Sequence, residues 1–202
     1  MYEAQEQSKN TFKPIITHVK KALRSLYDMI EMFVVAFAFI VFLYLFVASP
    51  HEVIGRSMED NFWDGEYLLA DKISYHINPP ERGDVVIFKQ TETADYIKRV
   101  IGLPGDTIEI RDGYFFVNGH QLVEEIYLNK NIYTDSNKFL SEGEIYTVPE
   151  DNYFVAGDNR SCSSDSRAFG PISADVIKGR AFLIYWPVTH LSWVTRQTYN
   201  TE

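Results

Sequence analysis

An uncharged run of seventeen residues, Met32–Ala48, limits how this chain can fold more than any other feature. Phe, Val, Leu and Ile occupy every face of any helix it forms, so a soluble protein would have to surround it completely. As a helix it covers roughly 26 Å, and extension back over Met29 and Ile30 brings it to the ~30 Å of a bilayer core. The run predicts a transmembrane helix at residues 30–49, with a buried core helix as the less favoured alternative.

The residues around the run favour a retained signal anchor over a cleaved signal peptide. The leader before it is long for a signal peptide. A cut after Ser49 would also place Pro50 directly after the scissile bond, where proline blocks most processing of this kind. We therefore expect the helix to stay attached to the rest of the chain.

Flanking charges predict the orientation of this anchor. After the run, Arg56 is the only lysine or arginine before Lys72. Three basic residues lie shortly before it: Lys20, Lys21 and Arg24. Because basic residues remain on the cytoplasmic side, we expect residues 1–29 in the cytoplasm and residues 50–202 outside it.

Charge and composition exclude several function classes. The formal net charge is −9, and the part after residue 49 holds 14 basic and 24 acidic side chains. Such a domain is repelled by a phosphate backbone, so no nucleic-acid partner is expected. A single cysteine, Cys162, rules out an internal disulfide framework. The five histidines are scattered without metal-ligand spacing, so neither a metal nor a cofactor is expected.

After residue 50 the pattern is typical of short strands separated by turns, with many Tyr and Phe residues. Two dipeptides that tolerate positive φ, Asp112-Gly113 and Asn118-Gly119, predict a three-strand meander over residues 107–123. Residues 124–143 show no period and are expected to form a loop, while 195–202 are expected to fray. The remaining predicted strands lie at 66–73, 84–89, 95–101, 144–148, 153–156 and 181–186.

Ser57 and Lys98 are the candidate catalytic pair. Taken alone, each is more often an ordinary turn hydroxyl or a surface lysine. In a strand only one of two adjacent residues faces inward, so if Lys98 faces in, Arg99 faces out with its charge in water. Burial lowers the pKa of a lysine, and a neutral amine can accept the proton of a serine hydroxyl. The sequence is thus compatible with a serine–lysine hydrolase.

A polar segment, Gly157–Pro171, is the third candidate element. Composition alone favours a surface loop. Its alternating Asp, Ser and Arg residues could also form a closed hydrogen-bonded network, with Arg167 forked onto Asp158 or Asp165. One of its serines could then orient the lysine amine.

Four segments together resemble the conserved boxes of bacterial type I signal peptidases: Ser57-Met58, Arg82–Phe88, Tyr96–Asp106 and Gly157–Arg167. They follow an anchor in the right order, and the similarity covers essentially residues 30–190. The resemblance implies a mostly β fold, an antiparallel, barrel-like sheet after one transmembrane helix, with residues 107–150 as a smaller inserted lobe. It further implies a serine endopeptidase of the bacterial plasma membrane. Such an enzyme cleaves signal peptides from exported preproteins after small-x-small sequences.

The resemblance also implies roles for individual residues. Ser57 would be the nucleophile and Lys98 the general base. Ser163 would bond the lysine amine, with a salt-bridged network of Asp158, Asp165 and Arg167 in support. The pockets for small side chains would be lined by Val53, Met58, Ile87, Tyr96 and Ile97.

Two positions depart from the pattern of that family. Asp60 stands where a proline is usual, so the loop is expected to be less rigid. Gly55 stands where some members place a serine hydroxyl that helps to hold the oxyanion. The oxyanion would then rest chiefly on the backbone N–H of Ser57.

Two other readings remain open from the sequence. One is a self-cleaving repressor protease, which also uses a Ser–Lys pair; the absence of its DNA-binding domain and the presence of the anchor argue against it. The other is a non-catalytic membrane scaffold for assembling exported proteins, with the pair present but unused.

Overall fold

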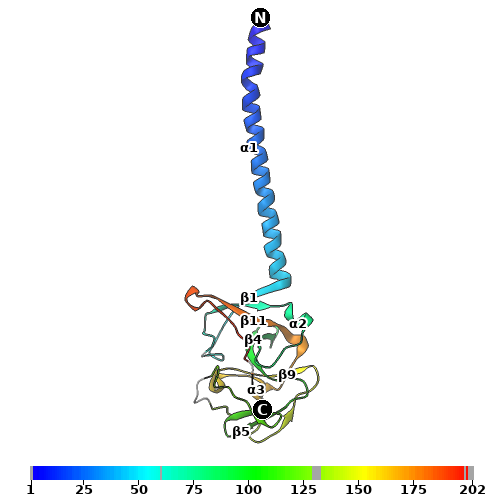
Figure 1. The fold of residues 1–202 in the computed structure, drawn as a ribbon, viewed down its shortest axis with the longest axis vertical. Coiled ribbons are helices and arrows are strands. Elements are labelled where there is room, and N and C mark those ends of the chain that lie inside the picture. The colour runs from blue at the N-terminus through cyan, green and yellow to red at the C-terminus, as the bar shows by residue number, and fades with distance from the viewer. Residues whose placement is uncertain (1, 60, 129–132, 198, 200–202) are drawn as a thin grey trace. The chain divides into compact units, whose positions relative to one another are not determined.

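The computed structural model describes residues 2–59, 61–128, 133–197 and 199, and the chain divides into two compact units, Met1–Leu45 and Phe46–Glu202. Helix α1, drawn in blue in Figure 1, spans Tyr2–Phe42 and continues as a π-helical turn, Leu43–Val47. Lys20–Val47 is long and apolar enough to cross a membrane. The large apolar side chains described from Leu23 to Phe46 are exposed, as expected of a helix that lipid rather than protein surrounds.

The helical segment ends two residues before the predicted limit at residue 49. Ala48 and Ser49 belong to strand β1 and pair with Asp71 and Ala70 of β2. Backbone pairing in the sheet therefore determines the end of the helix, a long-range contact that apolar composition does not reveal.

The second unit contains a large antiparallel sheet with the strand order β1-β2-β11-β3-β4-β9-β10, and β12 pairs with β11. Its strands are β1 (Ala48–Glu52), β2 (Tyr67–Asp71), β3 (Val85–Lys89), β4 (Asp95–Gly102), β9 (Asn152–Ala156), β10 (Ile172–Ser173), β11 (Ile177–Trp186) and β12 (Ser192–Trp193). The mostly antiparallel fold class predicted from the sequence is confirmed.

A smaller antiparallel sheet has the order β7-β6-β5-β8. Its strands are β5 (Thr107–Arg111), β6 (Tyr114–Val117), β7 (His120–Gln121) and β8 (Tyr146–Thr147). Both turn dipeptides have positive φ, with 52° at Asp112 and 54° at Asn118, so the predicted meander is confirmed. The strands predicted at 120–123 and 144–148 are shorter than expected.

Short helices occupy the connections between these strands. They are α2 (Ser74–Ile77), α3 (Ser166–Phe169) and three 3₁₀ turns, Arg160–Cys162, Ala174–Val176 and Val188–His190. The first of these turns and α3 lie in the polar segment after β9, so that segment contains regular helical turns and is not an irregular loop.

The prediction of a frayed C-terminus is wrong for the residues that the structure describes there. The Val194 amide donates to the carbonyl of Phe182 at 2.9 Å, and Arg196 forms an ion pair with the buried Asp84 at 2.7 Å. Tyr199 donates from its hydroxyl to that of Tyr127 at 2.8 Å. Distant partners order this segment, and nothing local in the sequence indicates them.

Candidate active site

The turn after β1 and the middle of β4 bring Ser57 and Lys98 together. The Lys98 Nζ atom lies 2.8 Å from the Ser57 Oγ atom. It also donates to the carbonyl of Ile97 at 2.8 Å. Lys98 is 3% exposed, so it faces inward, a direction that strand alternation alone had left open. The two groups are within the distance that direct proton transfer requires.

Burial lowers the pKa of Lys98 to about 8. Two carboxylates, Asp165 and Asp158, act in the opposite direction on this pKa but do not outweigh desolvation. The Tyr96 ring lies 5.2 Å from the amine. A substantial fraction of the amine is therefore neutral near physiological pH, whereas a lysine in water is almost wholly charged.

Arg99 does not face water, which corrects the sequence prediction. It is 2% exposed and donates two hydrogen bonds to Asp158. The Nε atom bonds Oδ1 at 2.8 Å, and a terminal guanidinium nitrogen bonds Oδ2 at 2.6 Å. Its other terminal guanidinium nitrogen donates to the carbonyl of Gly83 at 3.0 Å. The far face of β4 is covered by further protein, including the Tyr127 ring, so alternation there separates two buried environments rather than core from solvent.

Arg167 pairs with Asp165, one of the two partners left open by the sequence. Its Nε and terminal amine bond the two carboxylate oxygens at 2.9 and 2.8 Å. Burial raises the pKa of Asp165, but the bonds from Arg167 and from the Gly157 amide outweigh it, so the pKa is lowered. Each carboxylate that acts on Lys98 thus has its own buried arginine.

Ser163 does not make the expected bond to the lysine amine. Its Oγ atom is buried and has no hydrogen-bond partner among the described residues. A Cβ atom on Gly157 would lie 2.2 Å from this oxygen and 2.4 Å from the Ser57 carbonyl oxygen. Only glycine at position 157 allows the Ser57 carbonyl and the Ser163 side chain to approach the backbone so closely.

A cavity of about 580 Å³ opens beside the pair. It is lined by Ser57 and Lys98, and by four of the residues expected in the substrate pockets, Val53, Ile87, Tyr96 and Ile97. Met58 is not among the lining residues. It is 1% exposed, and its sulfur accepts from the Asp158 amide at 3.4 Å. Met58 thus links the turn that carries Ser57 to the segment after β9 and does not line the cavity.

Gly55 also lines the cavity and has φ of +92°. Its amide donates to the Asp64 carboxylate at 2.6 Å, so that amide is already engaged. The Ser57 amide makes no hydrogen bond within the part of the chain that the structure describes. Asp60, the other departure from the family pattern, lies outside the described residues.

Sequence reasoning missed several lining residues, among them His51, Asp95 and Cys162. They come from the end of β1, the start of β4 and the polar segment after β9. Proximity to Ser57 and Lys98 along the chain could have suggested the first two. Cys162 enters the cavity only because the loop folds back over the serine-bearing turn, where the Asn159 amide donates to the Ser57 carbonyl at 3.0 Å.

The profile of the family described as "Signal peptidase, peptidase S26" matches residues 26–186. This chain belongs to the signal peptidase family. The family consists of serine endopeptidases, and its type I members act on the signal peptides of preproteins, so the chain is a serine-type endopeptidase of that kind.

Individual relatives agree with the family assignment. Signal peptidase IB of Staphylococcus aureus is 34% identical over 190 residues, which cover 89% of this chain and 97% of the relative. A probable signal peptidase I-2 of Synechocystis is 36% identical over 157 residues, 74% of this chain and 68% of the relative. A solved signal peptidase I from Enterococcus faecalis is 33% identical and covers 52% of this chain and 97% of its own, with a TM-score of 0.41.

Proposed function

We propose that this chain is a membrane-anchored endopeptidase that cleaves signal peptides through a Ser57–Lys98 dyad. The observation that carries the proposal is the 2.8 Å separation of Lys98 Nζ and Ser57 Oγ on a cavity wall, with the amine buried. Neither a surface lysine nor an ordinary turn serine requires this arrangement. Burial of an amine without a carboxylate bonded to it is costly, and activation of a nucleophile explains it.

The chemistry follows from the positions of these two groups. Neutral Lys98 takes the proton of the Ser57 hydroxyl as the Oγ atom attacks the scissile carbonyl carbon. The amide of Ser57, which has no intramolecular acceptor among the described residues, stabilises the developing oxyanion. The resulting ammonium then protonates the leaving amine, and water releases the acyl group with Lys98 again as base.

Substrate selection belongs to the same cavity. An extended peptide places alternate side chains on one face, so residues one and three before the cut point towards the same wall. Val53, Ile87 and Ile97 supply apolar lining there. We propose that Ala, Gly or Ser is needed at these two substrate positions, and efficient cleavage after Phe or Lys would reject this pocket assignment.

The membrane arrangement is part of the proposal. Residues 30–49 would anchor the chain by a single pass in the bacterial plasma membrane. Residues 1–29 would stay in the cytoplasm, and residues 50–202, with the lobe at 107–150, would form the extracytoplasmic catalytic part. Lys20–Val47 supports a single anchor by its length and composition.

Purified protein in detergent, incubated with a preprotein that carries a small-x-small sequence, tests the proposal. Cleavage after that sequence is expected from the wild type and not from Ser57→Ala. Turnover by Ser57→Ala, or binding of the preprotein without any cleavage by the wild type, would favour a scaffold over a protease.

A further inference from the structure

The residues Val194–Gln197 and Tyr199, which we call the C-terminal strap, connect the two sheets of the second unit. At its start the strap is bonded to β11 of the large sheet through the Val194 amide. Arg196 then forms ion pairs with Asp84 and Glu81 in the loop before β3. At its end Tyr199 packs against the buried cluster that the smaller sheet shares with β4 and β9. The strap is therefore fastened at both ends to separate parts of the fold.

The strap backbone lies directly on the loop that holds Arg99. A Cβ atom on Gly83 would lie 2.0 Å from the carbonyl oxygen of Gln197, so glycine alone permits this contact. The carbonyl of the same Gly83 accepts a hydrogen bond from Arg99 at 3.0 Å. The strap and the arginine thus share one small loop.

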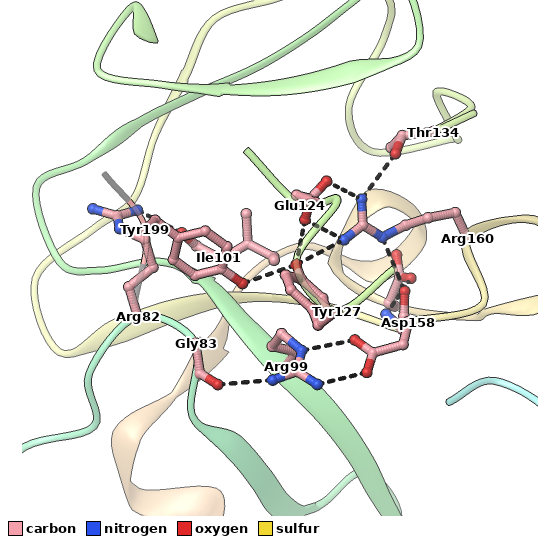
Figure 2. Close-up of polar contacts among 12 residues, drawn as sticks. Arg82, Gly83, Arg99, Ile101, Glu124, Tyr127, Thr134, Asp158, Arg160 and Tyr199 are labelled. Atoms are coloured by element: carbon pink, nitrogen blue, oxygen red, sulfur yellow. Dashed lines mark hydrogen bonds and ion pairs between the residues drawn. The ribbon is translucent and has the colours of Figure 1, made fainter. Parts of the chain in front are cut away.

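Tyr199 reaches Arg99 through a second contact, shown in Figure 2. Its hydroxyl donates to that of Tyr127 at 2.8 Å, and the two rings meet edge to face at 5.8 Å. The Tyr127 ring in turn lies 4.3 Å from the guanidinium carbon of Arg99. Glu124 accepts from the Tyr127 hydroxyl at 2.5 Å. Arg99 is therefore enclosed between Gly83, Tyr127 and Asp158.

The enclosed ion pair lies next to both members of the dyad. Arg99 follows Lys98 on β4, and Asp158 precedes Asn159, whose amide bonds the Ser57 carbonyl at 3.0 Å. Movement of the pair would therefore move both the strand that carries the base and the turn that carries the nucleophile.

The pair also affects the charge that surrounds the amine. The charged groups that act on Lys98 are the carboxylates Asp158 and Asp165. Arg167 holds Asp165, and Arg99 holds Asp158 with Asn61 as a neutral second donor. If water reached the Arg99–Asp158 pair, the desolvation of Lys98, which is the largest cause of its lowered pKa, would weaken. This change favours the protonated amine.

We propose that the C-terminal strap is a positioning element of the reaction: by covering the Arg99–Asp158 pair it keeps Lys98 neutral and within reach of Ser57. None of its residues lines the substrate cavity. The strap therefore acts through Gly83, Tyr127 and Arg99 rather than by touching the peptide. This inference rests on the proposed function, because it concerns the same dyad.

The test measures kcat and KM for preprotein cleavage by the full chain in detergent between about pH 6 and 10. It compares wild type, a truncation after Val194, Tyr199→Phe, and Tyr114→Phe as a control on an exposed tyrosine of β6. For the truncation we expect kcat at pH 7 to fall about tenfold and the midpoint of the pH profile to rise by about one unit, because one pKa unit is a tenfold change in neutral amine. KM should stay near the wild-type value, and activity should converge with wild type at the alkaline end.

Tyr199→Phe keeps the ring and removes only the hydroxyl. It therefore tests the positioning role of the strap even if the truncated chain does not fold. It should shift the midpoint in the same direction by a smaller amount, while Tyr114→Phe leaves the profile unchanged. A loss of kcat that is equal at every pH and follows a lower melting temperature would mean that the strap is only structural. Unchanged kcat and midpoint in both strap variants would also overturn the inference. If the wild type does not cleave, or Ser57→Ala cleaves as well as wild type, the proposed function itself fails and this inference with it.

Discussion

Lys98 and Arg99 are adjacent residues with opposite demands. In the proposed mechanism the Lys98 amine acts as a base only when it is neutral, which desolvation promotes, whereas the Arg99 guanidinium stays charged and needs a carboxylate when buried. β4 meets both demands by pointing Lys98 at the Ser57 hydroxyl and Arg99 at Asp158. The reactivity of the site therefore depends on two buried surroundings on opposite faces of a single strand.

Activity should depend on the protonation of Lys98. Cleavage should rise with pH through about 8, the lowered pKa of this amine, and fall in acid as the amine takes a proton. Lys98→Arg cannot deprotonate in this range and should lose essentially all turnover while remaining folded. Cleavage assays from about pH 6 to 10 with circular dichroism as the folding control would show this. A Lys98→Arg variant that cleaves near the wild-type rate would make Lys98 structural.

The same lowered pKa predicts how stability changes with pH. The unfolded chain holds the Lys98 proton up to about pH 10.5 and the folded protein only below about 8. Between these values the unfolded state binds more protons, so the wild type gains stability as pH rises. Lys98→Met lacks this term and should be more stable than wild type at pH 7 by up to ~3 kcal/mol, since one pKa unit is about 1.4 kcal/mol.

Urea unfolding of both proteins at about pH 7, 9 and 10.5 measures this difference. The advantage of Lys98→Met should shrink across that range and stay constant below about pH 8, where the folded protein also binds the proton. A difference that does not change with pH would show that the amine has an ordinary pKa.

At the scale of elements, the site depends on how closely the turn after β1 approaches the segment after β9. Gly157 directly follows β9, at the point where the Ser57 carbonyl and the Ser163 hydroxyl both approach the backbone. The Asn159 amide then bonds that carbonyl. Ser57, the proposed nucleophile, is therefore positioned by a segment about a hundred residues later in the sequence.

Gly157→Ala tests this close approach. Its Cβ atom would lie 2.4 Å from the Ser57 carbonyl oxygen, so the turn must move away from Lys98. A displacement of ~1 Å is expected to reduce kcat about a hundredfold. The control is Gly119→Ala, which has φ of +82° and no atom within 4 Å of its added Cβ. It should lose about 1 kcal/mol of stability through backbone strain and keep its activity. A wild-type kcat in Gly157→Ala would show that the close approach at Gly157 does not position Ser57.

At the scale of the whole molecule, the proposed arrangement places the apolar helix and the acidic part after residue 49 in different surroundings. The charges before the apolar run are basic, and the part after residue 49 is strongly acidic. The proposed orientation thus keeps the positive flank in the cytoplasm and places the dyad where exported preproteins emerge.

Protease added outside intact cells should digest the C-terminal part and leave an N-terminal tag protected. Exchange of Lys20, Lys21 and Arg24 for Gln should weaken this preference, because these residues supply the charge bias. Immunoblots against tags at each end give the result, with cells opened by detergent as the control. An N-terminal tag digested in intact cells would reverse the orientation and the proposed location of the substrate.

Features that depend on neighbouring residues could be predicted before the fold was known. An apolar run long enough for a bilayer and the Asp112-Gly113 and Asn118-Gly119 turns follow from local composition. The fold class and the pairing of Ser57 with Lys98 were also predicted, since the resemblance placed both residues in one family pattern.

Which distant groups meet could be seen only in the folded protein. It buries Arg99 against Asp158, leaves Ser163 without a partner among the described residues, and packs Tyr199 against Tyr127. The physical reason is that charge burial and side-chain packing depend on what covers a strand face or a chain end. That covering comes from segments far away in the sequence, and no local periodicity records it.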